Sequence, residues 1–515
     1  MIKDVEFGSF IINILTSGMY PEPMDAMREY IQNSYDGIKR AEKAGFLKKN
    51  FGDVRITVNE AEREVSIWDN GIGISSSEAL SRLLDIGASK KVLGEDAGFR
   101  GIGRLAGLAY ADKVIFKTSY EGEAVETILT FDAALIKQHI SPGNRNPISA
   151  VELMRKAARH REVDCDPAKR FFEVKLIGVD PEACPFLERE VVLSYLRQVA
   201  PVEFDSQAFT YAKAMVNPHL EKFGIRRSIN ISYEQKGGDP EPILKPYQTF
   251  HHAGKRKDNK VDVVDIETFG DIAENPKWVG WISKGRELPG VILDEEVRGI
   301  RFRMNNILIG DHTTMSRVFE KLAKSNIRFN GYYSGEIHII DNGVVPNARR
   351  DYFEDTPAWR AVEAELLELA TILGKRVRDN EAARNRPTSA VERDTDRTIE
   401  EVDAEAEEGF ATEAHRNRAV EKLKAQEEKI EKAIASERTP EEREALRIKK
   451  EEAANKRAEI EEKWKALVDE SALNRDERKI LRLVLGSIDE LLGPTVTKKV
   501  AHEVNKRLKR KKKKA

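Results

Sequence analysis

Residues 66–75 read SIWDNGIGIS, where an acid, an amide and two glycines directly follow an apolar stretch. From Arg63 to Trp68 the residues alternate with a period near two, which predicts a strand that ends where Asp69 begins. Asp-Asn-Gly is also a common turn composition, because glycine accepts positive φ and Asp and Asn bond to nearby backbone groups. The stretch alone leaves two interpretations open: a tight turn, or a strand end that carries a binding site.

The length and composition are typical of a multidomain protein. The chain has 515 residues, which predicts about three or four domains. It is 40% hydrophobic and 34% charged, and its apolar runs are shorter than the roughly 18 residues of a transmembrane helix. The N-terminal stretch MIKDVEFGSFIINIL contains acids and lacks a small-residue cleavage site, so it does not resemble a signal peptide. We therefore expect a cytoplasmic protein without a membrane partner.

Cysteine usage and charge indicate which partners the chain can hold. Cys165 and Cys184 are the only cysteines, too few for a disulfide framework or a zinc site. We expect reduced thiols and no metal site built from protein side chains alone. The formal net charge is −2, yet residues 509–514 are all basic. Such a tail can hold an anionic partner such as nucleic acid, and it can equally be a disordered, solubilising end.

The order of helical and strand patterns predicts an α/β protein with a helical C-terminal region. Residues 1–187 predict an α/β sandwich with helices on one face of a sheet, and residues 188–358 a second α/β domain. Strands are expected in the second domain at 278–283, 299–309 and 335–340. The other predicted segments are a helix and charged linker at 359–411, a helical hairpin coiled coil at 412–470, and C-terminal helices with the basic tail at 471–515. We expect residues 385–410 to be a flexible linker, because they are strongly charged and lack periodicity.

Two helix signals shape the expectation for the C-terminal region. Thr439-Pro440-Glu441-Glu442 combines an N-cap, a proline in the first turn and acids behind it, which favours an antiparallel hairpin over one helix kinked at Pro440. Further along, an apolar helix contains Ile480, Leu481, Val484, Leu485, Ile488, Leu491 and Leu492. This helix needs a partner, either the same segment of a second subunit or another part of this chain.

A second motif lies upstream, in residues 24–45, MDAMREYIQNSYDGIKRAEKAG. On a helix with 100° per residue, one narrow arc is polar and consists of Glu29, Asn33, Asp36 and Arg40. A polar arc is usually a solvated face. Asn33 and Gly37 are weak helix formers, however, and a plain surface would use better ones, so their placement favours a function.

A third motif, residues 94–119, reads GEDAGFRGIGRLAGLAYADKVIFKTS, with Gly94, Gly98, Gly101 and Gly103 ahead of an apolar helix that begins near Ile102. Glycines let backbone amides approach phosphates, and a helix N-terminus adds its positive dipole. No strand runs directly into these glycines and no Walker lysine follows them, so the two commoner nucleotide folds are disfavoured.

Together, these motifs resemble the GHKL superfamily of ATPases, which contains DNA gyrase B, the heat-shock-ninety chaperones, histidine kinases and MutL. The resemblance covers roughly residues 5–355. E-x-x-x-N-S-x-D-G matches residues 29–37, D-N-G-I-G matches residues 69–73, and G-F-R-G-I-G matches residues 98–103. It implies a GHKL-type α/β sandwich that binds ATP and Mg²⁺.

The resemblance also assigns roles to individual residues. Glu29 resembles the general base that activates the attacking water, and Asn33 resembles the magnesium ligand, with the metal also held by ATP phosphates. Asp69 is similar to the acid that accepts a hydrogen bond from the adenine amino group. Residues implied to contact the nucleotide are Asn33, Asp36, Asp69, Gly71, Gly73, Ser89, Lys90, Gly98, Arg100, Gly101 and Gly103.

The segment from Gly87 to Gly103 resembles the mobile ATP lid of the family. One departure concerns the far side of the base. The family places a Gly-Thr before a strand, and its threonine helps to bind adenine through water. The corresponding strand here, residues 171–177, has no threonine at its start. Which residue takes its place is left open.

The second domain resembles the middle, transducer domain of the heat-shock-ninety chaperones, which implies a ribosomal-S5-like α/β fold. The similar stretches are residues 299–311 and 335–355. The resemblance implies that Arg350, together with Asn347, reaches the γ-phosphate from outside the ATP domain. The alternative is that Arg349 and Arg350 pair with Asp351 or Glu354 at a surface.

The resemblance implies an ATP-driven homodimeric molecular clamp, chaperone-like, whose N-terminal segment can swap between subunits when ATP closes the dimer. The C-terminal region does not resemble a chaperone dimerisation domain. The alternative is a nucleic-acid clamp similar to MutL or the MORC proteins, in DNA repair, chromosome organisation or defence. A third hypothesis is a nucleotide-sensing scaffold with negligible hydrolysis. The partner, a protein client or DNA, would bind the C-terminal helices and basic tail.

Overall fold

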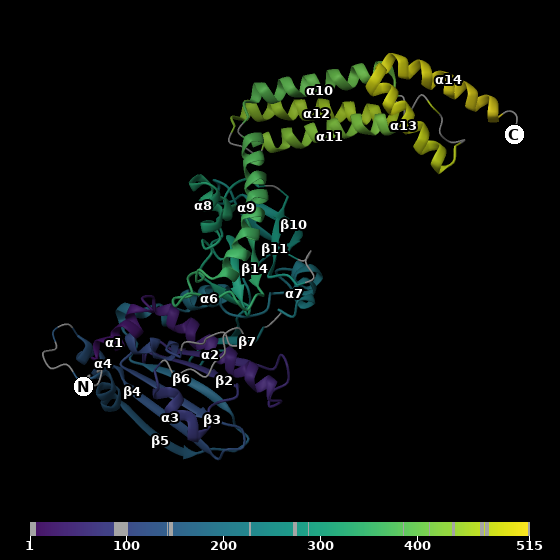
Figure 1. Ribbon diagram of the computed structural model, residues 1–515. Coiled ribbons are helices and arrows are strands. Elements are labelled where there is room, and N and C mark those ends of the chain that lie inside the picture. Colours follow the sequence, from purple (N-terminus) through teal and green to yellow (C-terminus); the bar gives the residue numbers. More distant parts are fainter. Residues whose placement is uncertain are drawn as a thin grey trace, which may run out of the picture. The chain divides into compact units, whose positions relative to one another are not determined.

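The computed structural model divides into two compact units, Met1–Gly374 and Lys375–Ala515 (Figure 1). It describes residues 7–512 except 87–100, 142, 144–147, 226–227, 271–274, 287, 385, 411–412, 435–437, 464–467 and 469–472. Among the described helices, none is both long enough and apolar enough to cross a membrane.

The first unit begins with a mixed sheet of eight strands. In spatial order they are β5 (Ala158–Asp164), β4 (Val125–Asp132), β3 (Lys113–Ser119), β6 (Phe171–Ile177), β2 (Glu64–Asp69), β1 (Asp53–Asn59), β7 (Asn230–Gln235) and β8 (Glu241–Pro242). Only β1 and β7 pair in parallel among these neighbours. The strand predicted at residues 171–177 is confirmed as β6.

Helices cover one face of this sheet, as predicted. They are α1 (Phe10–Asn13), η1 (Ile14–Gly18), α2 (Pro23–Lys43), α3 (Ser76–Leu84), η2 (Gly103–Ala109), α4 (Ala133–Ile140), α5 (Ala150–Ala157), η3 (Pro181–Phe186) and α6 (Arg189–Val199). Ile56 and Ile67 point into a core shared with Ile38 of α2. On the opposite face Arg55 stacks on Trp68, 5.0 Å from its ring centre. Alternation with a period of two therefore separates a core face from a solvent face.

The first sheet continues past the boundary predicted between residues 187 and 188. Strands β7 and β8 follow that position in the chain, yet β7 pairs with β1 along the register from Asp53↔Asn230 to Val58↔Gln235. An unpaired β1 would expose a row of backbone donors and acceptors, and the returning chain satisfies them. Strand β7 is short, and nothing in its sequence distinguishes a strand that pairs with β1 from one that pairs within the second domain.

The second sheet has six strands in the order β13 (Ile307–Ile309), β12 (Gly299–Met304), β14 (Ser334–Ile339), β11 (Trp278–Gly285), β10 (Lys260–Phe269) and β9 (Phe250–His252). Its helices are η4 (Ala212–Val216), α7 (Asn217–Lys222), α8 (Ser316–Leu322) and η5 (Lys324–Tyr332). The predicted strands are confirmed, with residues 299–309 forming a hairpin. Asn305 and Asn306 both have positive φ, 53° and 63°, which suits the tight two-residue turn of such a hairpin.

The second unit is helical, with α9 (Pro357–Arg384) leading into it. Its other helices are α10 (Thr388–Glu408), α11 (Glu413–Ile434), α12 (Pro440–Lys463), α13 (Arg475–Leu492) and α14 (Pro494–Lys512). The flexible linker predicted at 385–410 is wrong, because α10 buries Val391, Thr395, Val402 and Ala406 at helical spacing. The many charges of this stretch concealed a narrow apolar stripe.

Helices α11 and α12 form the predicted hairpin rather than one kinked helix. Ile430 and Ala433 of α11 pack with Leu446 of α12, so the two helices lie side by side. Thr439 and Glu442 start α12 with a reciprocal capping box: the Glu442 amide donates to Thr439 Oγ1 at 3.2 Å, and the Thr439 amide to Glu442 Oε2 at 2.9 Å.

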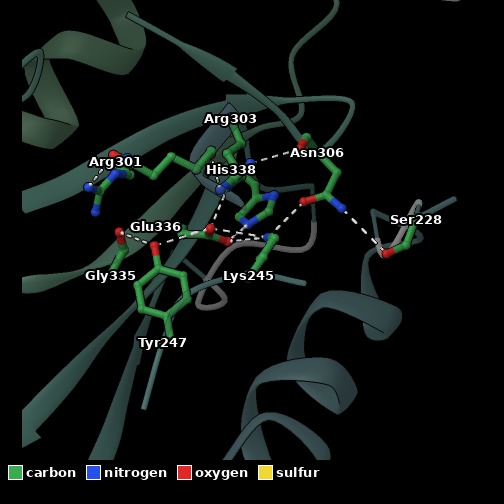
Figure 2. Close-up of polar contacts among 10 residues, drawn as sticks. Ser228, Lys245, Tyr247, Arg301, Arg303, Asn306, Gly335, Glu336 and His338 are labelled. Atoms are coloured by element: carbon green, nitrogen blue, oxygen red, sulfur yellow. Dashed lines mark hydrogen bonds and ion pairs between the residues drawn. The ribbon is translucent and has the colours of Figure 1, made fainter. Parts of the chain in front are cut away.

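A buried ionic cluster holds the second sheet together (Figure 2). Glu336 on β14 is fully buried and binds Arg303 Nε at 2.5 Å and Lys245 Nζ at 2.8 Å. Tyr247 and His338 also contact its carboxylate. Burial lowers the pKa of Lys245 to about 7, as does the neighbouring Arg303, while the two cations hold the Glu336 pKa well below its usual range despite its burial. One carboxylate thus pairs with two buried basic groups.

We predict that Glu336→Gln lowers the free energy of unfolding of the first unit by about 3–5 kcal/mol, because it leaves buried cations without a counter-charge. Urea unfolding followed by tryptophan fluorescence measures the change. Glu365→Gln is the matched control: its exposed carboxylate pairs with Lys277 at 2.8 Å, and its loss should cost less than about 1 kcal/mol. Equal losses in the two variants would contradict the prediction.

Candidate functional site

Helix α2 carries the polar arc predicted from residues 24–45, and that arc is largely buried rather than solvated. Glu29 is 9% exposed and Asp36 is 3% exposed, while Asn33 is half-buried one turn after Glu29. Pro23 stands in the first turn, where its missing N–H has no helical acceptor to lose. Burying carboxylates costs free energy unless a partner or ligand offsets it, so this face of α2 indicates a site.

The motif SIWDNGIGIS ends strand β2 at Asp69, whose side chain is 1% exposed. Asp69 Oδ1 accepts a hydrogen bond from the Gly71 amide at 2.9 Å. Burial raises the pKa of Asp69 from 3.8 to about 7, against hydrogen bonds from Ser34 and Gly71 that lower it. A deeply buried acid at a strand end beside α2 is more than a surface turn requires.

The loop after Asp69 is fixed on both sides. Asn70 Nδ2 donates to Phe51 O at 2.9 Å, and its Oδ1 accepts from the Asp53 amide at 2.9 Å. The Ile72 amide donates to Gly37 O on α2 at 3.0 Å. Asn70, which the motif left without a role, therefore anchors the loop to β1 and leaves Asp69 facing α2.

Two glycines of this loop are required by close approach. A Cβ on Gly71 would lie 2.6 Å from Asp69 Oδ1 and 2.7 Å from the Gly37 carbonyl carbon. Gly73 has φ +69°, and a Cβ there would lie 2.0 Å from Ser119 O. The backbone passes so near the carboxylate and the sheet that any side chain would displace it.

The sheet register shows which residues lie beside Asp69. Asp69 pairs with Phe172 on β6, and Phe172 pairs with Thr118 on β3, so the three share one row and one face. Thr118 Oγ1 accepts from the Ile74 amide at 2.8 Å and donates to Phe171 O at 3.0 Å. Phe172 thus lies next to Asp69 in this row, and the Thr118 hydroxyl holds the loop.

The glycine motif approaches the same face of α2. A Cβ on Gly103 would lie 2.0 Å from Glu29 Oε2, so only glycine lets this turn pass the carboxylate. Residues 103–109 form the 3₁₀ helix η2 rather than the predicted α-helix, and Tyr30 OH accepts from the Gly107 amide at 2.9 Å. Gly101 is described and has φ +68°. Ser89, Lys90, Gly98 and Arg100 of the predicted lid lie outside the described residues.

Arg350 reaches this site from the second domain. Its Nε lies 3.8 Å from Glu29 Oε1, and the two side chains are 7% and 11% exposed. Burial lowers the pKa of Arg350, against the nearby Glu29 carboxylate. The structure thus places Arg350 in a buried pair with the predicted base and not in the surface pair that was its alternative.

Sequence reasoning missed Arg28, which precedes Glu29 on α2. Its side chain is 6% exposed, forms an ion pair with Asp25 at 3.0 Å, and donates from Nη2 to Arg349 O at 2.8 Å. On a helical projection Arg28 falls outside the polar arc and resembles an ordinary surface arginine. Its acceptor lies 321 positions further along the chain, so local sequence gave no signal.

Comparison with known proteins finds a match for the part of the chain that contains α2 and the glycine loops. Residues 21–159 match the family described as histidine kinase-, DNA gyrase B-, and HSP90-like ATPase. The chain contains a GHKL-type ATPase domain. A 130-residue stretch is 27% identical to the chaperone protein HtpG of Acinetobacter baylyi, covering 22% of this chain and 20% of that relative. The chain therefore matches about a fifth of that relative's length, and the similarity is distant.

The pH dependence of stability tests the state of Asp69. Its folded pKa lies above its unfolded value, so the folded protein keeps a proton between pH 3.8 and about 7 that the unfolded chain releases. Its stabilising contribution is complete below pH 3.8 and is lost as the pH rises through about 7. We predict that between pH 5 and 8 the nucleotide-free protein loses roughly 2–4 kcal/mol relative to Asp69→Asn. Urea unfolding from pH 5 to 8 measures it, and a constant difference would refute the assignment.

Proposed function

We propose that this chain is an ATP-hydrolysing GHKL molecular clamp, chaperone-like in its core, that binds ATP with Mg²⁺. The observation that carries the proposal is the meeting of buried Glu29, the Gly103 turn and Arg350 at one face of α2. The matched ATPase family supports the nucleotide. The distant similarity to the chaperone protein HtpG supports the chaperone-like character.

The residues around the site fit an adenine nucleotide. Asp69 would accept a hydrogen bond from the adenine amino group, and Gly71 and Gly73 keep the backbone close enough to line the base. Asn33 would supply one amide oxygen to Mg²⁺, which otherwise takes phosphate oxygens and water. Bound Mg²⁺ would neutralise charge on the transferring phosphoryl group.

Glu29 and Arg350 would serve hydrolysis. Glu29, fixed on α2, orients the attacking water and takes its proton. Arg350 would stabilise charge that develops on the γ-phosphoryl group, and it comes from a domain that we propose to be a transducer with a ribosomal-S5-like fold. Its buried contact with Glu29 supports this role, because the guanidinium already lies beside the residue that must face the phosphate.

An exposed apolar stripe near the N-terminus supports closure of a dimer. Phe7, Phe10 and Ile14 are 61%, 50% and 59% exposed. Phe10 and Ile14 are four residues apart in the helical stretch formed by α1 and η1, so they share one face, and Phe7 lies just before that stretch. We propose that this stripe meets a second copy when ATP is bound.

Helix α13 supports a second, nucleotide-independent contact. Leu485 packs against Ala501 of α14, so one apolar face is used within the chain. Ile480, Val484 and Leu491 lie on another face and are 64%, 47% and 80% exposed, with Leu483 beside them at 66%. Their spacing is that of a coiled-coil seam, and a two-fold pair of such helices would cover both stripes. We propose that α13 joins two copies into a homodimer.

We predict that Leu483→Glu with Leu491→Glu makes the nucleotide-free dimer dissociate, because each charge would be buried in an apolar seam. Sedimentation velocity measures the mass of the assembly. Ile448→Glu is the matched control: it lies on α12, is 51% exposed, and should leave the dimer intact. A wild-type monomer, or a dimer in the double variant, would rule out the α13 contact.

Glu29→Ala tests the mechanism. We predict that the variant binds ATP with wild-type affinity and hydrolyses it about 10²–10⁴-fold more slowly, as expected for the loss of a general base. Steady-state turnover and equilibrium binding of ATP give the two readouts. Glu60→Ala is the control, since this exposed carboxylate lies in the β1–β2 turn, at the end of β2 opposite to Asp69. Unchanged turnover in Glu29→Ala would overturn the mechanism, and negligible wild-type turnover would favour a nucleotide-sensing scaffold.

The alternative of a nucleic-acid clamp is supported by helix α14. Lys498, Lys499, Lys506 and Arg507 are exposed on it, while Ala501 packs with α13. Such a basic surface can bind phosphates with an affinity that falls as salt rises. The turnover assay, repeated with duplex DNA at low and high salt, separates the two functions. Stimulation that fades with salt favours the nucleic-acid clamp in repair, chromosome organisation or defence, and indifference to DNA favours a protein client.

A further inference from the structure

Two consecutive residues of α2 meet two consecutive residues of the second domain. Glu29 lies beside the Arg350 guanidinium, with Nε and Oε1 3.8 Å apart. Arg28 Nη2 donates to the carbonyl oxygen of Arg349 at 2.8 Å. Helical geometry fixes Arg28 and Glu29 relative to each other, so both contacts move together.

The carbonyl that Arg28 holds controls the direction of Arg350. The Arg349 carbonyl and the Arg350 amide belong to one planar peptide unit. A hydrogen bond that holds the carbonyl oxygen therefore also fixes the orientation of the peptide plane that precedes Arg350. Arg350 has φ +56°, a left-handed conformation that a non-glycine residue keeps only where several contacts impose it. Other contacts on this turn are Gly310 N to Arg350 O at 2.7 Å and Arg350 N to Asn347 O at 3.1 Å. From the ATPase domain, Arg28 holds the backbone of this turn, and Arg349 Nη2 donates to Gly18 O at 3.4 Å.

The chemistry of Arg28 suits this role. Asp25, one turn earlier on α2, pairs with the same Nη2 at 3.0 Å and so orients the guanidinium. A planar guanidinium can serve a carboxylate and a carbonyl at once with fixed directions, whereas a lysine ammonium is a point charge on a flexible stem. The side chain is 6% exposed, so water does not compete strongly for the carbonyl.

We infer that Arg28 is a positioning residue for ATP hydrolysis: by gripping the Arg349 carbonyl it holds the Arg350 guanidinium in register with Glu29. The inference rests on the proposed function of Glu29 and Arg350. It adds that the ATPase domain itself sets the direction of the arginine which the second domain contributes. Arg28 needs no contact with the nucleotide, so its loss should affect turnover and spare binding.

The first test is the split between turnover and binding. Arg28→Gln should lower kcat by about 10²-fold, the effect expected when a reacting group is misplaced by about 1 Å, and leave the Kd for ATP within about twofold. Arg28→Lys should recover part of kcat, because lysine restores a hydrogen-bond donor but not the planar, directed set of donors of a guanidinium. Arg159→Gln is the matched control. That exposed arginine also donates to backbone carbonyls, of Lys156 and Ala158, but on edge strand β5.

The second test is a double-mutant cycle with Arg350→Ala. If Arg28 acts through Arg350, adding Arg28→Gln to Arg350→Ala should change kcat by less than about twofold, because nothing is left to position. Three results would each overturn the inference. They are effects of the two substitutions on kcat that multiply in the double variant, an unchanged kcat in Arg28→Gln, and a loss of ATP affinity as large as the loss of kcat. Should Arg28→Gln fail to fold, Asp25→Asn removes the orienting partner instead, and the same cycle must again show no further loss beyond Arg350→Ala.

The outcomes separate this inference from the proposed function. If Glu29→Ala and Arg350→Ala both retain wild-type turnover, the proposed hydrolytic mechanism fails, and the inference about Arg28 fails with it. If both lose turnover while Arg28→Gln keeps it, the mechanism stands and only the positioning role is wrong.

Discussion

The buried pair of Glu29 and Arg350 is the interaction on which the candidate site depends. Each charge would be costly to bury alone, and each is supplied by a different part of the chain. At 3.8 Å the pair is longer than a hydrogen bond, so its attraction is coulombic rather than a locked geometry. A carboxylate and a guanidinium held this way have different tasks: one can orient a water, and the other can meet an anion. Docking of the second domain therefore completes the site rather than merely covering it.

Glycines set how closely the backbone can surround the two acids. Gly71 passes Asp69 and Gly103 passes Glu29 at distances that exclude a Cβ. Main chain thus lies close to both carboxylates, alongside the side chains of Ser34 and Arg350 that also contact them. The same limit explains why the sequence places glycine at these positions despite its conformational cost on folding.

Local patterns predicted the elements, and long-range pairing escaped them. Strand β6 has the bounds expected from residues 171–177, and Arg350 lies beside Glu29, the predicted general base. Both expectations came from short sequence motifs. The return of β7 to β1, the contact of Arg28 with Arg349 O and the row that puts Phe172 beside Asp69 join residues far apart in sequence. Periodicity carries no information about such partners. Helix α10 was missed for a different reason, since its charges outnumber a narrow buried stripe.

The buried ionic cluster around Glu336 and the turn that carries Arg350 both contact the hairpin β12–β13 or the residue that follows it. Arg303 and Asn306 belong to the hairpin β12–β13. Arg303 binds Glu336 and Gln198 O, and Asn306 accepts from Lys245, so three contacts hold the hairpin. Gly310, directly after β13, donates its amide to Arg350 O. Gln198 lies on α6, which packs against α2. The hairpin that holds Arg350 is thus tied to the helix layer of the ATPase domain. An interior ion network is weak evidence for stability, but a network that fixes the direction of one hairpin has a use in placing an arginine within reach of a carboxylate on another domain.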